Sequence, residues 1–107
     1  MTEAILLYIT TEDKQEAQSI GKALVEEKLV ACVNIMENMQ AMFWWKDKVD
    51  KASETVLIAK TKKSLLSEVI EKINSMHSYE CPCVIALPII GGNESFLQWI
   101  QESTKNS

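Results

Sequence analysis

The sequence predicts an α+β fold in which helices cover one face of a single sheet. Apolar runs of strand length alternate with segments whose apolar residues recur at helical spacing. The 107 residues suffice for one core and are too few for two, so we expect one domain over residues 1–107. Hydrophobic residues make up 47% of the chain and charged residues 24%, which is typical of a globular protein and not of a disordered one.

The first strand and the first helix are read from residues 4–28. Residues 4–9 form a continuous apolar run of strand length, as in a central strand. Thr10 or Thr11 is placed to cap the helix that follows, and this helix is expected to end near Lys28. Its apolar face consists of Ala17, Ile20, Gly21 and Leu24.

A long hairpin is predicted next. A short apolar strand at residues 31–35 continues past residues 37–38 into the aromatic-rich segment 40–45. Residues 46–48 read as the hairpin tip, and the chain returns through an apolar strand at residues 55–61. We expect these middle strands to be long and bent.

Two helices and a fourth strand complete the pattern. Ser64 is placed to cap a helix that delivers the chain to His77. Residues 83–89 form the fourth strand, and Gly91-Gly92-Asn93 breaks it and caps a short final helix. The two helices present apolar faces made of Leu66, Val69, Ile70 and Ile73, and of Phe96, Leu97 and Ile100. The order βαββαβ plus a C-terminal helix is the split βαβ pattern of a ferredoxin-like domain.

The strands carry more apolar surface than one helix layer can cover. If helices cover one face of the sheet, the surplus must lie on the other face. An exposed apolar patch promotes association, so we expect a homo-oligomer. The residues assigned to the uncovered face are Tyr8, Val33, Ile35, Trp44, Leu57 and Ile85.

Charge and cysteine content exclude several classes of protein. A net charge of −4 disfavours binding to nucleic acid, which requires a concentrated basic surface. No apolar run approaches the roughly 20 residues of a membrane span, and no leader pattern is found, so we expect a cytoplasmic protein. Three cysteines are an odd number, and thiols stay reduced in the cytosol, so a disulfide framework is not expected.

Residues 77–83 contain the densest set of metal donors in the chain. This segment holds the only histidine, His77, together with Glu80, Cys81 and Cys83. Imidazole, carboxylate and thiolate groups are ligands for copper or zinc. The spacing matches no established zinc motif, and the segment can equally be a turn from helix to strand.

Six segments, spread in order over nearly the whole chain, carry a resemblance to a known family. They are residues 29–35 (LVACVNI), 43–46 (FWWK), 57–61 (LIAKT), 77–82 (HSYECP), 87–89 (LPI) and 97–100 (LQWI). Together they resemble the CutA divalent-cation-tolerance family. The resemblance implies a ferredoxin-like subunit in a stable homotrimer, similar to the PII signalling proteins, in which the long hairpins complete sheets between subunits. It also implies tolerance to divalent metals, copper binding as in some members and, in animals, a link to acetylcholinesterase anchoring.

The resemblance extends to individual residues. His77, Tyr79 and Glu80 match the family's His-Pro-Tyr-Glu segment, with Ser78 in place of the proline, which makes this turn less rigid. Cys32 matches the family's Ala-Cys-Val-Asn strand.

Three residues depart from the family pattern. Cys81 and Cys83 stand where an aliphatic and an acidic residue are expected, so the Cys-Pro-Cys element belongs to this chain alone. Asp47 occupies the hairpin tip where glycine is common, which leaves the turn type open.

Each candidate metal ligand has a structural alternative. His77 can interact with the carbonyls at the end of its helix instead of binding metal. Cys32 in an apolar strand is by default a buried, inert thiol. Cys81 and Cys83 can offer two soft sulfurs to Cu(I) or Zn, or simply begin a strand.

Two functions remain open, and neither is enzymatic because no nucleophile and base stand in a recognisable motif. The first is a metal-binding or metal-response trimer that holds copper or another divalent cation and needs no organic cofactor. The second is a PII-like signalling or interaction trimer that binds a small ligand or a partner protein at clefts between subunits. The residues expected at these clefts are Trp44, Trp45, Glu54 and Lys60.

Overall fold

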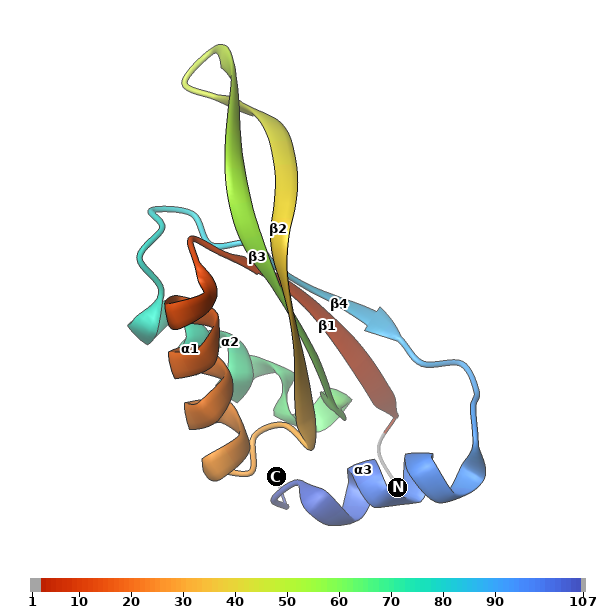
Figure 1. Cartoon of the computed structure of the whole chain (residues 1–107). Coiled ribbons are helices and arrows are strands. Elements are labelled where there is room, and N and C mark those ends of the chain that lie inside the picture. Colours follow the sequence, from red (N-terminus) through yellow and green to blue (C-terminus); the bar gives the residue numbers. More distant parts are fainter. Residues whose placement is uncertain (1–2, 107) are drawn as a thin grey trace.

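The computed structural model describes residues 3–106, which form a four-stranded antiparallel sheet and three α-helices (Figure 1). The elements in chain order are β1 (Ala4–Thr11), α1 (Lys14–Glu26), β2 (Cys32–Trp45), β3 (Lys48–Lys62), a 3₁₀ turn (Lys63–Leu65), α2 (Leu66–Met76), β4 (Val84–Pro88) and α3 (Glu94–Ser103). The predicted α+β class and the predicted order of elements are confirmed.

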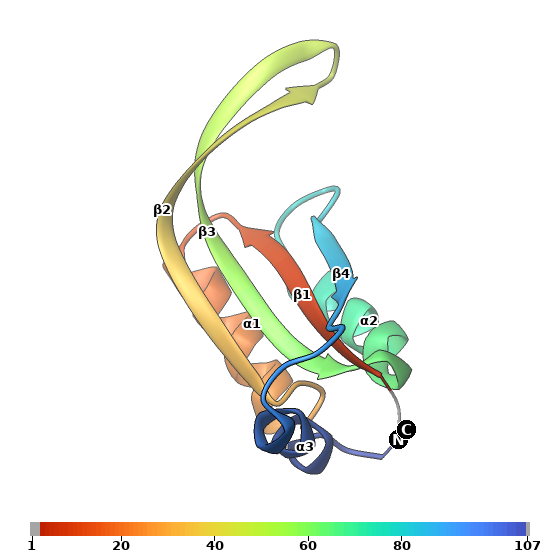
Figure 2. The same ribbon diagram turned by 90° about the vertical axis from the view of Figure 1, so that its right-hand side faces the viewer.

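The sheet has the strand order β2-β3-β1-β4, with every neighbouring pair antiparallel. Helices α1 and α2 lie together on one face, and α3 crosses the lower end of the opposite face (Figure 2). Lys60 of β3 places its Nζ 5.9 Å from the ring centroid of Phe96 in α3. Most of this second face is therefore left open by the chain itself.

The core lies between the sheet and the pair α1 and α2. Its largest fully buried side chains include Leu7, Ile9, Ile20, Leu24, Leu57 and Ile73. At Gly21 the helix approaches the sheet so closely that an added Cβ would lie 3.1 Å from Cγ2 of Val33. The absence of a side chain at this position permits the close packing of α1 on β2.

The assignment of apolar residues to the uncovered face was partly wrong. Leu57 is fully buried and is paired with Ile9 and Ile35, so these three side chains share the helix-covered face. Val33 also packs against the core. Tyr8 is paired with Ile85, which is 54% exposed, and both lie on the open face as predicted.

Two predicted helix caps are replaced by other residues. Asp13, and neither Thr10 nor Thr11, caps α1: its Oδ1 accepts a hydrogen bond of 2.8 Å from the N–H of Glu16. The Thr11 hydroxyl instead donates to the Thr55 carbonyl at 2.8 Å, which ties β1 to β3. Helix α2 begins directly after the 3₁₀ turn, so Leu65 occupies its cap position and Ser64 lies inside the turn.

The hairpin of β2 and β3 extends beyond the rest of the sheet as a curved arm (Figure 2). The pairing of β2 with β3 shifts in register between Met36 and Met39, and Asn38 in this stretch has a φ of 61°. This bulge lies where the arm begins to extend beyond the other strands of the sheet. The turn consists of Lys46 and Asp47 alone, while Lys48 already belongs to β3. The predicted long, bent hairpin is confirmed, with a turn shorter than predicted.

Candidate functional site

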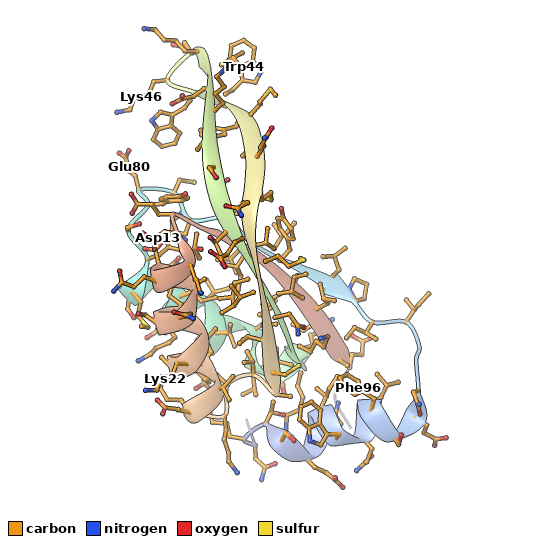
Figure 3. All side chains as sticks on the ribbon, viewed as in Figure 1. Asp13, Lys22, Trp44, Lys46, Glu80 and Phe96 are labelled. Atoms are coloured by element: carbon orange, nitrogen blue, oxygen red, sulfur yellow. The ribbon has the colours of Figure 1, made fainter. Side chains whose placement is uncertain are left out.

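A cleft of about 960 Å³ lies between the arm and the loop that joins α2 to β4. Its walls are residues 8, 10 and 12 near the end of β1, residues 39–43, 45, 50 and 52–54 of the arm, and residues 78–81 and 83 of the loop. Figure 3 shows Glu80 on this loop, below the arm tip that carries Trp44 and Lys46. Of the predicted donors, Glu80, Cys81 and Cys83 therefore line this cleft, while His77 is not among the lining residues.

The His77 side chain is fully buried and does not line the cleft. Its Nε2 lies 2.7 Å from the Thr10 carbonyl oxygen, and its Nδ1 accepts a hydrogen bond of 3.1 Å from the Tyr79 N–H. A carbonyl can only accept, so Nε2 carries the proton and the ring is the neutral Nε2–H tautomer. The ring bonds to β1 and not to the terminal carbonyls of α2, and both nitrogens are already engaged. The metal-ligand role of His77 stays a prediction that would require breaking one of these bonds.

Glu16, which sequence reasoning did not single out, holds the start of the loop. Its carboxylate accepts hydrogen bonds from the N–H of Glu12 at 2.9 Å and of Ser78 at 2.8 Å, and lies 3.8 Å from His77 Nδ1. Burial alone would raise the pKa of Glu16, but the hydrogen bonds from Glu12 and Ser78 together lower it below its ordinary value. The spacing of Asp13 and Glu16, typical of a capping box, was the signal available in the sequence.

Tyr79 joins the loop to the arm. Its hydroxyl donates a hydrogen bond of 2.6 Å to Oε2 of Glu54, a residue of β3 that is only 8% exposed. Burial, followed by the Glu54 hydrogen bond and charge, raises the pKa of Tyr79. Glu54 was predicted at a cleft between subunits, and that stays a prediction; its bond to Tyr79 within the chain follows only from the fold.

Glu80, Cys81 and Cys83 all line the cleft. Glu80 and Cys81 are exposed, and Cys83 is half-buried, with its carbonyl accepting a hydrogen bond of 3.3 Å from the Thr10 N–H. Within residues 3–106, no three His, Cys, Asp or Glu side chains lie close enough to one another to hold a metal ion.

Cys32 lies apart from the other candidate ligands. Cys32 is paired with Lys60 across the sheet, and Lys60 is paired with Leu6 of β1. Cys83 instead bonds to Thr10, four residues further along β1. At about 3.3 Å per residue, Cys32 and Cys83 are therefore roughly 13 Å apart in the direction of the strands. Cys32 is half-buried, with its Sγ 3.7 Å from Lys60 Nζ.

The residues predicted for subunit clefts do not converge within one chain. Trp45 and Glu54 line the cleft, but Trp44 is 75% exposed at the arm tip. Lys60 donates a hydrogen bond of 2.7 Å to Asn34 near the other end of the hairpin. Trp44 is paired with Val49, which lies 11 residues before Lys60 on β3. About 36 Å of strand therefore separates Trp44 from Lys60.

Fold and cleft together define a class: a small α+β protein whose antiparallel sheet projects a hairpin arm over a ligand-sized cleft. Residues 5–103 match the sequence profile of the CutA1 divalent ion tolerance protein family. The chain belongs to this family, as the six sequence segments had indicated.

Individual relatives agree with this assignment. The chain is 42% identical over 99 residues to the divalent-cation tolerance protein CutA of Archaeoglobus fulgidus, covering 92% of this chain and 96% of that protein. It is 41% identical over 103 residues to the chloroplastic protein CutA of Arabidopsis thaliana, covering 96% of this chain. The chain spans 57% of the length of that plant relative and 59% of the length of a chloroplastic relative from Oryza sativa subsp. japonica.

Solved structures show the same fold. The crystal structure of CutA1 from Oryza sativa matches with a TM-score of 0.96 and 40% identity, covering 99% of this chain and 97% of that one. CutA1 from Thermus thermophilus matches with a TM-score of 0.93 and 35% identity, covering 95% and 99%. No helix within residues 3–106 is long and apolar enough to cross a membrane. The expected cytoplasmic location stays a prediction, because the relatives include proteins named as chloroplastic and as periplasmic.

Proposed function

We propose that this chain acts in divalent-cation tolerance as a binding protein, not an enzyme, that holds copper or another divalent cation in the cleft beneath the arm. One observation carries the proposal: the cleft is lined by carboxylates, while no Lys, Arg or His is among its described lining residues. A cavity lined by one sign of charge concentrates ions of the opposite sign. The lining carboxylates belong to Glu12, Asp50, Glu54 and Glu80.

The cleft also supplies suitable ligand atoms. Carboxylate oxygens bind divalent cations, and the thiols of Cys81 and Cys83 add soft donors that suit copper or zinc. No organic cofactor is needed for this role. We place the protein in the cytoplasm, where these thiols stay reduced.

Metal binding can be tested by calorimetric titration with Cu²⁺ and Zn²⁺. Glu12→Gln combined with Glu80→Gln removes two exposed cleft carboxylates and should weaken binding by about tenfold or more. Glu26→Gln combined with Glu71→Gln removes the same charge from exposed helix positions outside the cleft lining and should leave the affinity unchanged. Equal losses in both double variants would show diffuse attraction by net charge and would refute a site in the cleft.

We further propose that the chain assembles as a homotrimer. The open face carries exposed apolar side chains, including Ile85 at 54% and Leu87 at 47%, and the arm tip exposes Trp44. An arm that reaches beyond its own subunit is suited to a closed ring of identical copies. The number of copies comes from the family resemblance, and the strand order β2-β3-β1-β4 supports its ferredoxin-like assignment.

Light scattering tests this assembly and should give three times the chain mass of 12.1 kDa. Ile85→Lys places a charge on the open face and should shift the protein toward monomers. Val25→Lys makes the same change on α1, where Val25 is 39% exposed, and should leave the mass unchanged. A monomeric parent protein would contradict the proposal.

A second candidate function is the PII-like one, in which a signalling trimer binds a small ligand or a partner protein. The aromatic rings of Phe43, Trp45 and Tyr79 favour it, since all three line the cleft. The volume of about 960 Å³ also falls within the usual range of ligand pockets, roughly 300 to 1,000 Å³. A ligand screen by thermal shift tests this function, because a tight ligand must raise the unfolding temperature.

A further inference from the structure

We infer that the cleft binds a linear aliphatic polyamine, which lies along the arm with one ammonium group at Asp50 and another at Glu54. The inference rests on the proposed role of the cleft as a cation site, and it adds an organic class of ligand. The amino groups of such a chain, like that of lysine, are protonated at neutral pH. Its charges therefore have the sign that the cleft attracts.

The arm has two different faces. Residues directly opposite each other on paired strands point to the same side, and so do residues two positions apart. The face that lines the cleft, the cleft face, consists of Met39, Ala41, Phe43 and Trp45 of β2 and of Asp50, Ala52 and Glu54 of β3. The outer face carries the pair Trp44 and Val49, and Figure 3 shows Trp44 on the side of the arm away from Glu80.

The cleft face has a low apolar floor with a carboxylate at each end. Asp50 and Glu54 lie four residues apart on β3, so about 13 Å of strand separates them. Between them Ala52 is paired with Ala41, and each of these side chains is a single methyl group. A hydrocarbon chain can lie over this floor while its charged ends meet the two acids.

The spacing of the two acids suits a long cation and not a metal ion. Oxygen ligands lie about 2.0 to 2.6 Å from a divalent ion, so two ligands of one ion are at most about 5 Å apart. The nine bonds between the terminal nitrogens of spermidine span about 11 Å when extended, since three backbone bonds advance about 3.6 Å. One such chain can therefore reach both Asp50 and Glu54, which are too far apart to share one ion.

Glu54 offers an oxygen atom to a ligand in the cleft. The residue is only 8% exposed, and its Oε2 accepts the hydrogen bond of 2.6 Å from the Tyr79 hydroxyl. Among residues 3–106, every fully buried side-chain oxygen or nitrogen has a hydrogen-bond partner. Oε1 of Glu54 has none within these residues, so it must open into the cleft that Glu54 lines. A carboxylate so enclosed gains from a cation that pairs with its open oxygen.

At the other end of the floor, Asp50 lies beside an aromatic ring. Phe43 is directly opposite Asp50 on β2, and both residues line the cleft. An ammonium group at this end can pair with the carboxylate and lie against the ring, which attracts cations. The same kind of contact occurs nearer the arm tip, where Lys46 Nζ lies 5.8 Å from the ring centroid of Trp45.

The two faces of the arm suit different contacts. A neighbouring copy packed on the cleft face would take the carboxylates of Asp50 and Glu54 out of water, which is costly unless each is paired with a cation. The outer face instead presents Trp44 and Val49, which are 75% and 65% exposed. This apolar pair is the better surface for another copy of the chain, so the cleft face is left for a small cation.

The test compares two amines by calorimetric titration of the full-length protein. Spermidine should bind with one molecule per chain. In 1,3-diaminopropane the two ammonium groups are too close together to meet both acids, so it should bind about tenfold or more weakly, because it loses one hydrogen bond to a charged group. Equal affinities for the two amines would refute a site that extends from Asp50 to Glu54.

Charge variants locate the two ends of the ligand. Asp50→Asn and Glu54→Gln should each weaken spermidine binding by about tenfold. Asp47→Asn removes the same charge at the arm tip, outside the cleft lining, and should leave the affinity unchanged. Equal losses in all three variants would show diffuse attraction by net charge and would refute the site.

Two further variants test the ring and the floor without changing the charge. Phe43→Leu should weaken spermidine binding by about threefold. Phe96→Leu removes a ring of similar exposure on α3, outside the cleft lining, and should have no effect. Ala52→Leu fills the exposed floor and should weaken binding by about tenfold. Circular dichroism establishes that each variant is folded, and unchanged affinity in both Phe43→Leu and Ala52→Leu would refute the placement along the arm.

The outcomes separate this inference from the proposed metal function. If Cu²⁺ or Zn²⁺ binds and spermidine does not, the polyamine site is refuted and the divalent-cation site stands. If spermidine binds and loses affinity in Asp50→Asn and Glu54→Gln while neither metal ion binds, the polyamine site stands and the divalent-cation site fails. If neither class of cation binds, both proposals fail.

Discussion

The His77 ring donates a hydrogen bond of 2.7 Å from its Nε2 to the carbonyl oxygen of Thr10. The two residues are 67 positions apart, one directly after α2 and the other in β1. The bond is shielded from water, because the His77 side chain is fully buried. It anchors the beginning of the loop that forms one wall of the cleft, so His77 positions the candidate ligands without being exposed to the cavity.

The first prediction concerns the stability that this bond provides. His77→Ala should lower the free energy of unfolding by about 3 kcal/mol, since it leaves a small cavity and an unpaired Thr10 carbonyl. Thermal unfolding at a fixed chain concentration measures the loss. His77→Gln should recover part of it, because an amide can still donate to Thr10. A His77→Ala protein that keeps its stability but loses copper would instead support the interpretation of His77 as a ligand.

The second prediction concerns the bond between Tyr79 and Glu54. Tyr79→Phe removes the donor to a nearly buried carboxylate and should cost about 2 kcal/mol of unfolding free energy. Tyr8→Phe is a matched control, because its hydroxyl donates only to the weakly accepting sulfur of Met39, and it should cost less than about 1 kcal/mol. Chemical denaturation of both variants gives the comparison. Equal losses of unfolding free energy in the two variants would show that the charge of Glu54 does not strengthen its hydrogen bond with Tyr79.

The third prediction concerns acid stability and Glu16. The folded-state pKa of Glu16 is lowered from its ordinary value of 4.5, so its ionised form stabilises the fold at higher pH. This contribution should be fully present above pH 4.5 and should be lost as the pH falls through the lowered pKa. Glu16→Gln should therefore be about 1 kcal/mol less stable than the parent at pH 7, with the difference closing below pH 4.5.

Denaturant unfolding from pH 7 to pH 3 tests this pH dependence. Glu26→Gln, an exposed change on the same helix, serves as the control and should run parallel to the parent across the range. A stability difference for Glu16→Gln that stays constant down to pH 3 would show that ionisation of Glu16 does not matter to the fold.

The order of the elements could be predicted because each segment carries its own period. Helices α1 and α2 repeat apolar residues at helical spacing, and the strands are continuous apolar runs. Continuous runs do not reveal which side chains face the helices. Leu57 was assigned to the wrong face for this reason, because its neighbours Val56 and Ile58 are equally apolar and only pairing with β1 sets the phase.

The candidate site could be predicted only where its residues are close in sequence. Glu80, Cys81 and Cys83 lie within four positions, and the fold keeps them at one cleft. Cys32 was grouped with them by residue type, and strand register separates it. The place of Met39 in the cleft wall, beside Tyr8, could not be predicted, since it depends on a bulge that leaves no clear sequence signal.

The last prediction concerns the turn at the arm tip, where Lys46 and Asp47 have φ angles of 51° and 63°. Two consecutive left-handed residues make a type I′ turn, which favours glycine at its second position. Asp47→Gly removes the energetic cost of a left-handed backbone at a residue with a side chain. It also adds conformational entropy to the unfolded chain, which is a smaller cost. The substitution should therefore stabilise the protein by about 0.5 to 1 kcal/mol. Lys48→Gly makes the same substitution one residue later in regular strand and should destabilise by about 0.5 to 1 kcal/mol. Urea denaturation at a fixed chain concentration compares the two variants. A loss of stability in Asp47→Gly would mean that the aspartate side chain holds the turn in a way that outweighs the backbone preference.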